Sequence, residues 1–148
     1  VELFEIARSK DINLNLAISN KSKKIKYYFR KNINMLNTIN IKFAKNNFLK
    51  GFKTSLIQSH TLNSILKKTY FSKKIDFLNL DIEGNEINAL KSLDFKKYCP
   101  KVICVEMHKT TGRNKKNQLE NNSLFKFLKK KGYKYFWNKE FSYIFKKR

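Results

Sequence analysis

Glycine and proline are scarce in this chain, which has four glycines and one proline in 148 residues. The glycines are too far apart to form a Gly-x-Gly cofactor loop, and no Gly/Ser/Pro-rich linker or internal repeat divides the chain. A chain of this length can bury one core. We therefore interpret residues 1–148 as a single domain without a glycine-rich cofactor turn of its own.

Long apolar runs and cysteine motifs are absent too. No stretch of about 18 apolar residues occurs, so no transmembrane helix is expected. The first ten residues, VELFEIARSK, contain no basic segment followed by an apolar one, and do not read as a secretory signal. Cys99 and Cys104 form no CxxC motif. We expect two free thiols in a reducing cytoplasm, and we predict no metal site.

Acidic residues are few, 11 against 33 lysines and arginines, which gives a net charge of +22. One interpretation is a surface that binds the phosphates of RNA, DNA or an acidic membrane. The other is a biased composition, because lysine is spread along the chain together with abundant asparagine and isoleucine. Arginine, which clamps phosphates with paired hydrogen bonds, is rare. The four arginines are Arg8, Arg30, Arg113 and Arg148. The biased composition is favoured.

Strand-like and helix-like patterns alternate along the chain, which predicts an α/β domain with a mostly parallel sheet. Strands are expected at residues 12–19, 25–29, 54–60, 75–82 and 101–107, and a terminal hairpin at 133–137 and 141–145. Helices are expected at residues 1–9, 61–68, 85–93 and 117–131, with residues 32–47 as a loop that contains a short helix. Thr61 is the predicted N-cap of its helix, and Gly132 ends the last one.

Six of the eleven acids lie between residues 76 and 106, and three of these fall in the heptapeptide LDIEGNE. The strand before it, IDFLNLDI, is apolar on both faces, as in a central parallel strand. Asp81 ends this strand, Glu83 lies in the turn, and Glu86 opens the next helix. Ligands of open α/β sheets bind outside the carboxyl ends of the strands. We therefore expect two or three carboxylates at the binding crevice.

Each polar candidate also has a plainer interpretation. Glu86 fits a charge that the helix dipole favours in a first turn. Glu106, at the end of the next strand, either lies beside Asp81 across the sheet or faces solvent. Asp81 is the hardest to explain without a ligand, because a carboxylate that ends an apolar strand is costly unless it is paired. His108 is a further candidate, whereas His60 reads as structural or as a surface residue.

The segment FLNLDIEGNEINALKSLDFKKYCPKVICVEMH resembles the FkbM-type methyltransferases. That family has a strand ending in an Asp-x-Glu-Gly-x-Glu turn, a helix with a leucine, a Pro-Lys pair and a strand ending in glutamate. The corresponding residues are Asp81, Glu83, Gly84, Glu86, Leu90, Pro100, Lys101 and Glu106. The resemblance extends from about residue 2 to about residue 135. It departs at Asn63, where the family usually has an aspartate, which puts a role for an acid there in doubt.

The resemblance implies a class I methyltransferase sheet, which is Rossmann-like and mostly parallel with a C-terminal antiparallel hairpin, here without its first strand or strands. It also implies transfer of a methyl group from S-adenosylmethionine to a hydroxyl of a sugar, glycan or small metabolite. Such a reaction needs alignment of the acceptor oxygen and removal of its proton. In this chain Asp81, Glu83 or His108 would orient or deprotonate the hydroxyl.

The sequence contains only a small part of the cofactor-binding half of the site. In the family this half begins with a strand and a glycine-rich turn, whereas Val1 corresponds to a helix beyond them. We therefore expect an N-terminally truncated domain that binds S-adenosylmethionine weakly or not at all. What remains of the cofactor site is the Asp81 turn and the end of the strand 12–19. The residues expected to approach the adenine are Ala17, Ile18 and Ser19.

Two other functions stay open at this point. One is a basic nucleic-acid-binding module, or an RNA-directed protein with a methyltransferase fold, and the other is an inactive fragment. Lysines gathered around the Asp81 crevice, with aromatic residues available for stacking, would favour nucleic acid. Lysines spread evenly over all faces would favour a small-molecule or glycan acceptor. The sequence leaves the oligomeric state open.

Overall fold

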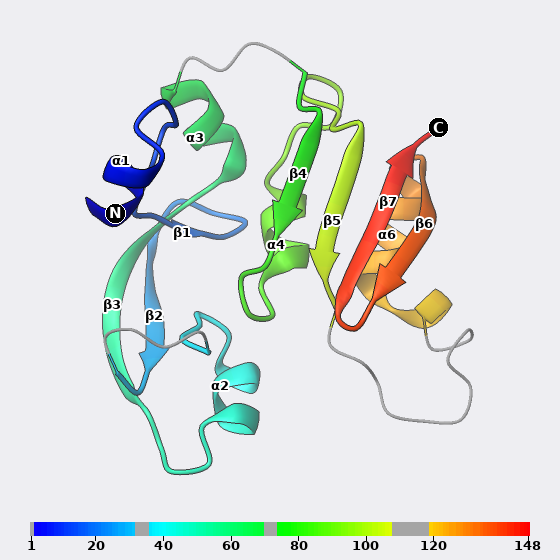
Figure 1. Ribbon diagram of the computed structural model, residues 1–148. Coiled ribbons are helices and arrows are strands. Elements are labelled where there is room, and N and C mark those ends of the chain that lie inside the picture. The colour runs from blue at the N-terminus through cyan, green and yellow to red at the C-terminus, as the bar shows by residue number, and fades with distance from the viewer. Residues whose placement is uncertain (1, 32–35, 70–73, 108–118) are drawn as a thin grey trace.

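The computed structural model describes residues 2–31, 36–69, 74–107 and 119–148. In chain order the elements are α1 (Glu2–Ala7), β1 (Ala17–Ile18), β2 (Lys24–Phe29), α2 (Ile41–Asn47), β3 (Lys53–His60), α3 (Leu62–Lys68), β4 (Phe77–Leu80), α4 (Glu86–Lys91), β5 (Val102–Glu106), α6 (Ser123–Lys130), β6 (Tyr133–Lys139) and β7 (Ser142–Lys147). Strands and helices alternate through most of the chain (Figure 1). The predicted α/β class is therefore confirmed.

The described strands form two sheets, with the orders β1-β3-β2 and β4-β5-β7-β6. The pairs β1–β3 and β4–β5 are parallel, whereas β2–β3, β5–β7 and β6–β7 are antiparallel. The terminal hairpin is thus confirmed, but the expected single, mostly parallel sheet is not what these strands form. A parallel pair needs a crossover connection, which α4 supplies between β4 and β5, while a tight turn joins β6 to β7.

The main core lies between the four-stranded sheet and the helices α4 and α6, which lie behind that sheet in Figure 1. Burial alternates along β5, where Ile103 and Val105 are fully buried and their neighbours only half-buried. Leu90 of α4 and Leu128 of α6 are also fully buried. The helices therefore cover one face of the sheet, with the alternation that a strand with one packed face requires.

The helix ends follow the capping residues that the sequence offers. Thr61 is the N-cap of α3, and its hydroxyl accepts a hydrogen bond from the backbone N–H of Ser64 at 3.0 Å. Asn122 caps α6 in the same way, and Gly132, with φ +82°, follows the end of that helix. The predictions for Thr61 and Gly132 are confirmed.

Two predicted strands are shorter and more exposed than their sequences indicate. In the segment 12–19 only Ala17 and Ile18 form a strand beside β3, and Ile12 is 69% exposed. β4 was expected as a central strand, but it lies at the edge of its sheet, and Phe77 is 57% exposed. A central strand needs a neighbour on both sides, and the described residues supply none beyond β1 or β4.

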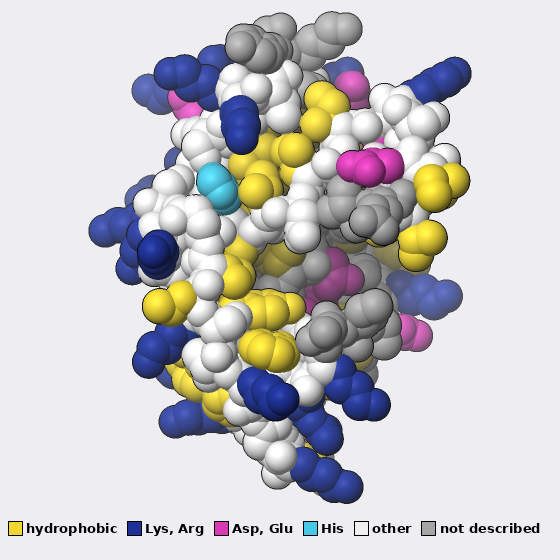
Figure 2. All heavy atoms as spheres, turned by 90° about the vertical axis from the view of Figure 1, so that its left-hand side faces the viewer, with side chains coloured by type: hydrophobic (Ala, Val, Ile, Leu, Met, Phe, Trp, Pro, Cys, Tyr) yellow, Lys and Arg dark blue, Asp and Glu magenta, His cyan; other side chains and the backbone are white. Residues whose placement is uncertain are grey.

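The face seen from the side of the three-stranded sheet carries both apolar and basic side chains (Figure 2). Hydrophobic side chains gather in the middle of this face, and lysine and arginine side chains lie mainly along its margins. The large apolar residues that are exposed in the structure include Leu3, Ile6, Ile12, Leu14 and Leu56. The described lysines and arginines therefore lie mainly at the margins of this face.

Side-chain hydrogen bonds connect α3 to the turn after α4. The hydroxyl of Ser92 accepts from the backbone N–H of Leu62 at 2.9 Å, and the carbonyl oxygen of the Asn63 side chain accepts from the N–H of Asp94 at 2.7 Å. Asn63 thus has a structural role at the position where the chain departs from the family pattern. Both cysteines are free, as predicted. Within the described ranges, every helix is too short or too polar to span a bilayer.

Candidate functional site

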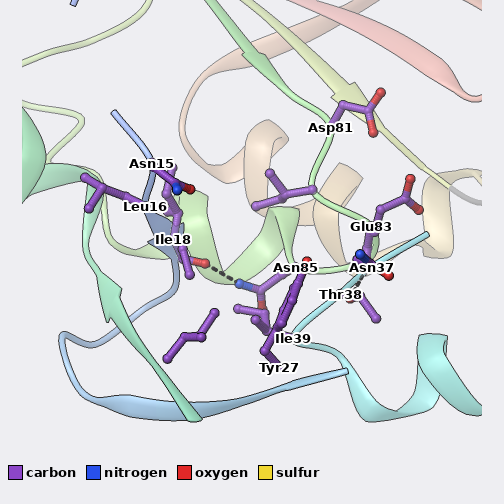
Figure 3. A pocket seen from close by; sticks show the side chains of 13 residues that line it. Asn15, Leu16, Ile18, Tyr27, Asn37, Thr38, Ile39, Asp81, Glu83 and Asn85 are labelled. Atoms are coloured by element: carbon purple, nitrogen blue, oxygen red, sulfur yellow. Dashed lines mark hydrogen bonds between the residues drawn. The ribbon is translucent and has the colours of Figure 1, made fainter. Parts of the chain in front are cut away.

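A cavity of about 570 Å³ opens between the two sheets at the carboxyl end of β4 (Figure 3). Its walls come from residues 15–18, from residues 37–39, from Tyr27 of β2 with Ile57 of β3, and from the turn after β4. The lining is mostly apolar, with a few amide, hydroxyl and carboxylate groups, which is typical of a small-molecule site. The cavity lies where ligands of α/β sheets are expected.

The acidic turn, residues 81–86, leads from β4 into α4. Glu83 and Gly84 both have positive φ, +53° and +87°, which is uncommon for a glutamate. Glu86 holds the turn from inside, because its Oε1 accepts hydrogen bonds from the backbone N–H groups of Ile82 at 3.0 Å and Gly84 at 3.1 Å. The side chain is buried. Glu86 is therefore more than a charge at a helix end, since it fixes the shape of the turn.

Three polar side chains tie the acidic turn to the other sheet. The Thr38 hydroxyl donates to the backbone carbonyl of Glu83 at 2.7 Å, and the Asn40 amide donates to that of Gly84 at 2.6 Å. The Asn85 amide donates to the carbonyl oxygen of the last residue of β1 at 2.7 Å (Figure 3). Strained backbone persists where its surroundings hold it in place. These bonds fix the turn and define the distance across the cavity.

Three carboxylates meet at this turn. Oxygen atoms of Asp81, Glu83 and Glu106 all lie within 4.8 Å of one another. The strand register explains the meeting, because Leu80 pairs with Val105, so that the next residue of each strand also lies side by side. Of the two positions that the sequence left open for Glu106, the structure shows the one beside Asp81.

The carboxylates change one another's acidity. Burial, followed by the charges of Glu83, Asp81 and Glu86 and by a hydrogen bond with Asp81, raises the pKa of Glu106 to about 7. Burial, followed by the charges of Asp81 and Glu86, raises the pKa of Glu83. A group that titrates near neutral pH can take up or release a proton during a reaction. The cluster therefore suits proton transfer.

The same cluster has the composition of a cation site. Carboxylate oxygens at this spacing could bind a hard divalent ion. Exposed acidic groups are, however, common without one, and nothing else among the described residues at the site indicates a metal. The chemistry that the arrangement supports directly is the orientation and deprotonation of a hydroxyl.

Four of the six predicted site residues line the cavity, namely Ala17, Ile18, Asp81 and Glu83. Ser19 does not. It is buried, and its backbone N–H donates to the carbonyl of His60 at 2.9 Å. His108 lies outside the described residues. The catalytic and cofactor-binding roles of all six residues stay predictions.

Sequence reasoning missed the side chains that hold the turn. Thr38 and Asn40 lie in a polar segment predicted as a loop with a short helix. The sequence LNTIN at residues 36–40 occupies a place that the family pattern expects, but neither side chain was given a role. Asn85 adjoins the acidic turn, but it was interpreted only as the start of a helix. Tyr27 and Ile57 line the cavity from β2 and β3, and they could be placed only once the pairing of these strands was known.

The sequence model of the methyltransferase FkbM domain matches residues 3–135, which include every residue that lines the cavity. This chain belongs to the FkbM methyltransferase family. The resemblance inferred from the Asp-x-Glu-Gly-x-Glu turn and its flanking strands is thereby confirmed. No curated protein and no solved structure matches the chain significantly. Family membership makes this FkbM domain a methyltransferase domain, and its acceptor has to be argued from the site.

Proposed function

We propose that this FkbM domain transfers a methyl group from S-adenosylmethionine to a hydroxyl of a sugar, glycan or small metabolite. The observation that carries the proposal is the cavity between the sheets, to which the acidic turn brings Asp81 and Glu83. The family supports the choice of cofactor, because its members generally use S-adenosylmethionine. The carboxylates support a hydroxyl acceptor, since they can hold such a group and take its proton.

The cavity fits the cofactor in part. Leu16, Ile18 and Ile57 give it an apolar wall that suits an adenine ring, and Tyr27 lies beside them. The Asp81 carboxylate suits ribose hydroxyls or a nearby positive charge. However, no lysine, arginine or glycine lines the described cavity. It therefore offers neither a cation for the carboxylate of the cofactor nor the close backbone approach that glycine allows, and we expect weak binding.

The residues of the chain would act on the acceptor. When bound, the cofactor supplies a methyl group on a positively charged sulfur, which is a good leaving group. The protein has to hold the acceptor oxygen in line with that methyl group and remove the hydroxyl proton. Asp81 and Glu83 line the cavity and would orient the hydroxyl, and Glu106 lies beside them with a pKa of about 7. We assign proton removal to this group of carboxylates together, with His108 as a further candidate.

The charge of the chain does not favour a nucleic-acid acceptor at this site. No lysine or arginine among the described residues lines the cavity, and Figure 2 shows the described basic side chains mainly along the margins of one face. A groove that follows a nucleic-acid backbone needs cations beside it. A small-molecule or glycan acceptor agrees better with an apolar, acidic cavity.

The proposal can be tested by NMR titration of the isotope-labelled chain with millimolar S-adenosylmethionine. We expect amide resonances of residues 16–18 and 81–85 to shift, and the shifts to shrink in Asp81→Asn. The matched control is Asp11→Asn, which alters a surface ion pair with Arg8 and leaves the titration unchanged. Shifts confined to other parts of the chain, or equal shifts in both variants, would contradict the proposal. Transfer of labelled methyl to a set of monosaccharides then tests the acceptor class.

A further inference from the structure

Asn85 stands at the N-cap of α4, yet its side chain makes no capping hydrogen bond. Asparagine is among the residues that most often cap helices, and Asn40 and Asn122 do so in this chain for α2 and α6. The Asn85 side chain is 4% exposed and lines the cavity. The helix therefore begins without the cap that Asn85 could provide, and this side chain serves another contact.

That contact is with the end of β1. The Asn85 amide nitrogen donates to the Ile18 carbonyl oxygen at 2.7 Å (Figure 3). The N–H of the same peptide group, which belongs to Ser19, donates to the carbonyl of His60 in β3. Because the C=O and N–H of a trans peptide point in opposite directions, the Ile18 carbonyl points away from β3. Asn85 thus binds β1 on the side that β3 does not, and we call this hydrogen bond the tie.

The orientation of the Asn85 amide is fixed at its other end. Its carbonyl oxygen accepts a hydrogen bond from the side-chain amide of Asn88 at 2.8 Å, and Asn88 lies about one turn further along α4. Since the oxygen accepts from Asn88, the nitrogen is the atom that faces Ile18. Both polar ends of Asn85 are used within the protein, which fits a residue that holds other groups in place.

We propose that Asn85 is a positioning residue, which keeps the end of β1 at a fixed separation from the acidic turn so that one ligand contacts both. The cavity is lined by Ala17 and Ile18 on the first of these walls and by Asp81 and Glu83 on the second. A cofactor seated on the first wall meets an acceptor held by the second only while their separation is fixed. The identity of this ligand rests on the proposed methyl transfer, whereas the tie itself does not.

Two substitutions remove the tie and leave a residue that can cap α4. Serine is neutral and a good N-cap, but its side chain is one bond shorter and does not reach the Ile18 carbonyl in Asn85→Ser. Aspartate keeps the size of the side chain but has no N–H to donate in Asn85→Asp. The matched control is Asn122→Ser, which makes the same change at the N-cap of α6, away from the described cavity.

Amide hydrogen exchange of the chain without ligand measures the tie directly. The Ser19 amide reports on the end of β1, because it is bonded to His60. We expect it to exchange at least about tenfold faster in Asn85→Ser and Asn85→Asp, since the end of β1 opens more often, while the amides of β5 keep their rates. Asn122→Ser should leave the exchange rate of the Ser19 amide within about twofold of the wild-type rate.

Titration with S-adenosylmethionine, followed by amide NMR, then tests the positioning. In the wild-type chain and in Asn122→Ser, resonances of residues 16–18 and 81–84 should shift together with one Kd. In Asn85→Ser, residues 16–18 should still shift, with Kd raised by at most about tenfold. The shifts of residues 81–84 should shrink by about half or more, because the ligand no longer contacts both walls. A loss of stability alone would weaken both sets of shifts equally.

The positioning role is overturned if the Ser19 amide exchanges at its wild-type rate in both Asn85 variants, or if Asn122→Ser accelerates it as much. It is equally overturned if both walls still shift together and to the wild-type extent in Asn85→Ser. If neither wall of the wild-type chain responds to S-adenosylmethionine, the proposed function fails, and the exchange of Ser19 still decides whether Asn85 holds the end of β1. Circular dichroism of each variant shows whether the fold is retained.

Discussion

The two sheets of this domain differ in how much of their apolar surface is buried. The four-stranded sheet packs one face on α4 and α6 and supplies most of the core, including the fully buried Leu90 and Ile103. The three-stranded sheet leaves Leu56 of β3 68% exposed. Burial of apolar surface stabilises a fold by roughly 25 cal/mol per Å². The free energy of folding is therefore concentrated in the four-stranded half.

The junction between the three-stranded and four-stranded halves is held by hydrogen bonds of polar side chains. Hydrogen bonds from Thr38, Asn40 and Asn85 connect backbone groups of the acidic turn and of β1. Each such bond contributes only about 0.5–1.5 kcal/mol, but it has strict geometry. We infer from this comparison that the apolar core provides most of the stability of the fold, whereas polar side chains at the junction set the shape of the site. Four predictions test this division.

The largest effect is expected from Leu90→Ala in α4. Leu90 is 0% exposed, so the change removes buried apolar contacts and leaves a cavity, at a cost of about 2–5 kcal/mol in the free energy of unfolding. Leu56→Ala, the same change in the exposed part of β3, should cost less than about 0.5 kcal/mol. Urea unfolding measures both variants. Similar losses for the two would show that the three-stranded half is packed more tightly than the structure indicates.

The next effect is expected from Gly84→Ala in the acidic turn. Gly84 has φ +87°, and an added Cβ would lie 3.0 Å from the Asn40 side-chain nitrogen. Asn40 cannot move freely, because it also caps α2, so the strained backbone and the lost contact should together cost about 2–3 kcal/mol. Gly51→Ala, with φ +81° and open space around it, should cost only about 1–2 kcal/mol. Thermal unfolding compares them, and equal losses would mean that Asn40 adapts.

Thr38→Val tests the hydrogen bonds that one hydroxyl makes at the junction. Thr38 is 2% exposed, and its hydroxyl donates to the Glu83 carbonyl and accepts from the backbone N–H of Asn40, so valine removes both bonds at a cost of about 1–2 kcal/mol. Hydrogen exchange should also rise in residues 81–85 while β5 stays protected. Thr54→Val on the exposed part of β3 is the control and should change stability by less than about 0.5 kcal/mol. If hydrogen exchange of residues 81–85 were unchanged in Thr38→Val, Thr38 would not be what holds the turn in place.

The sequence predicted the elements of the four-stranded half better than the edges of either sheet. Periodicity and caps placed α3, α6 and the β6–β7 hairpin, because these signals are local in the chain. The strands at 12–19 and 75–82 were expected to be buried from their apolar pattern alone. Their exposure depends on which neighbours are present, and no local pattern encodes that.

The residues of the site also fall into two groups, those that a local sequence pattern indicates and those that depend on contacts distant in the sequence. Asp81 and Glu83 could be found because a carboxylate after an apolar strand has a cost that calls for an explanation. The position of Glu106 beside them depends on the register of β4 and β5, and the sequence left it open. Thr38, Asn40 and Asn85 act through contacts with residues about 45 to 67 positions away, so the local sequence does not reveal what their side chains hold.

The smallest expected effect concerns pH and the carboxylates at the junction. The pKa of Glu106 is about 7 in the folded chain, above the ordinary value of 4.5 that we assume for the unfolded chain. Between these values the folded state binds more protons than the unfolded state, so the free energy of unfolding falls as pH rises. The contribution of Glu106 is therefore fully present below the ordinary carboxyl range and lost above about pH 7. Solvent screening reduces its size, because Glu106 is only partly buried.

Glu106→Gln removes this titration and should make stability less dependent on pH between about 5 and 8. Glu120→Gln, at an exposed position, is the control and should retain the wild-type dependence. Urea unfolding across this range measures the difference, and carbon-13 NMR of the Glu106 carboxyl group should show its midpoint near 7 directly. A Glu106→Gln variant with the wild-type pH profile would mean that the three carboxylates do not hold a proton among them. The assignment of proton removal to that group would then lose its support, while the division between core and junction would stand.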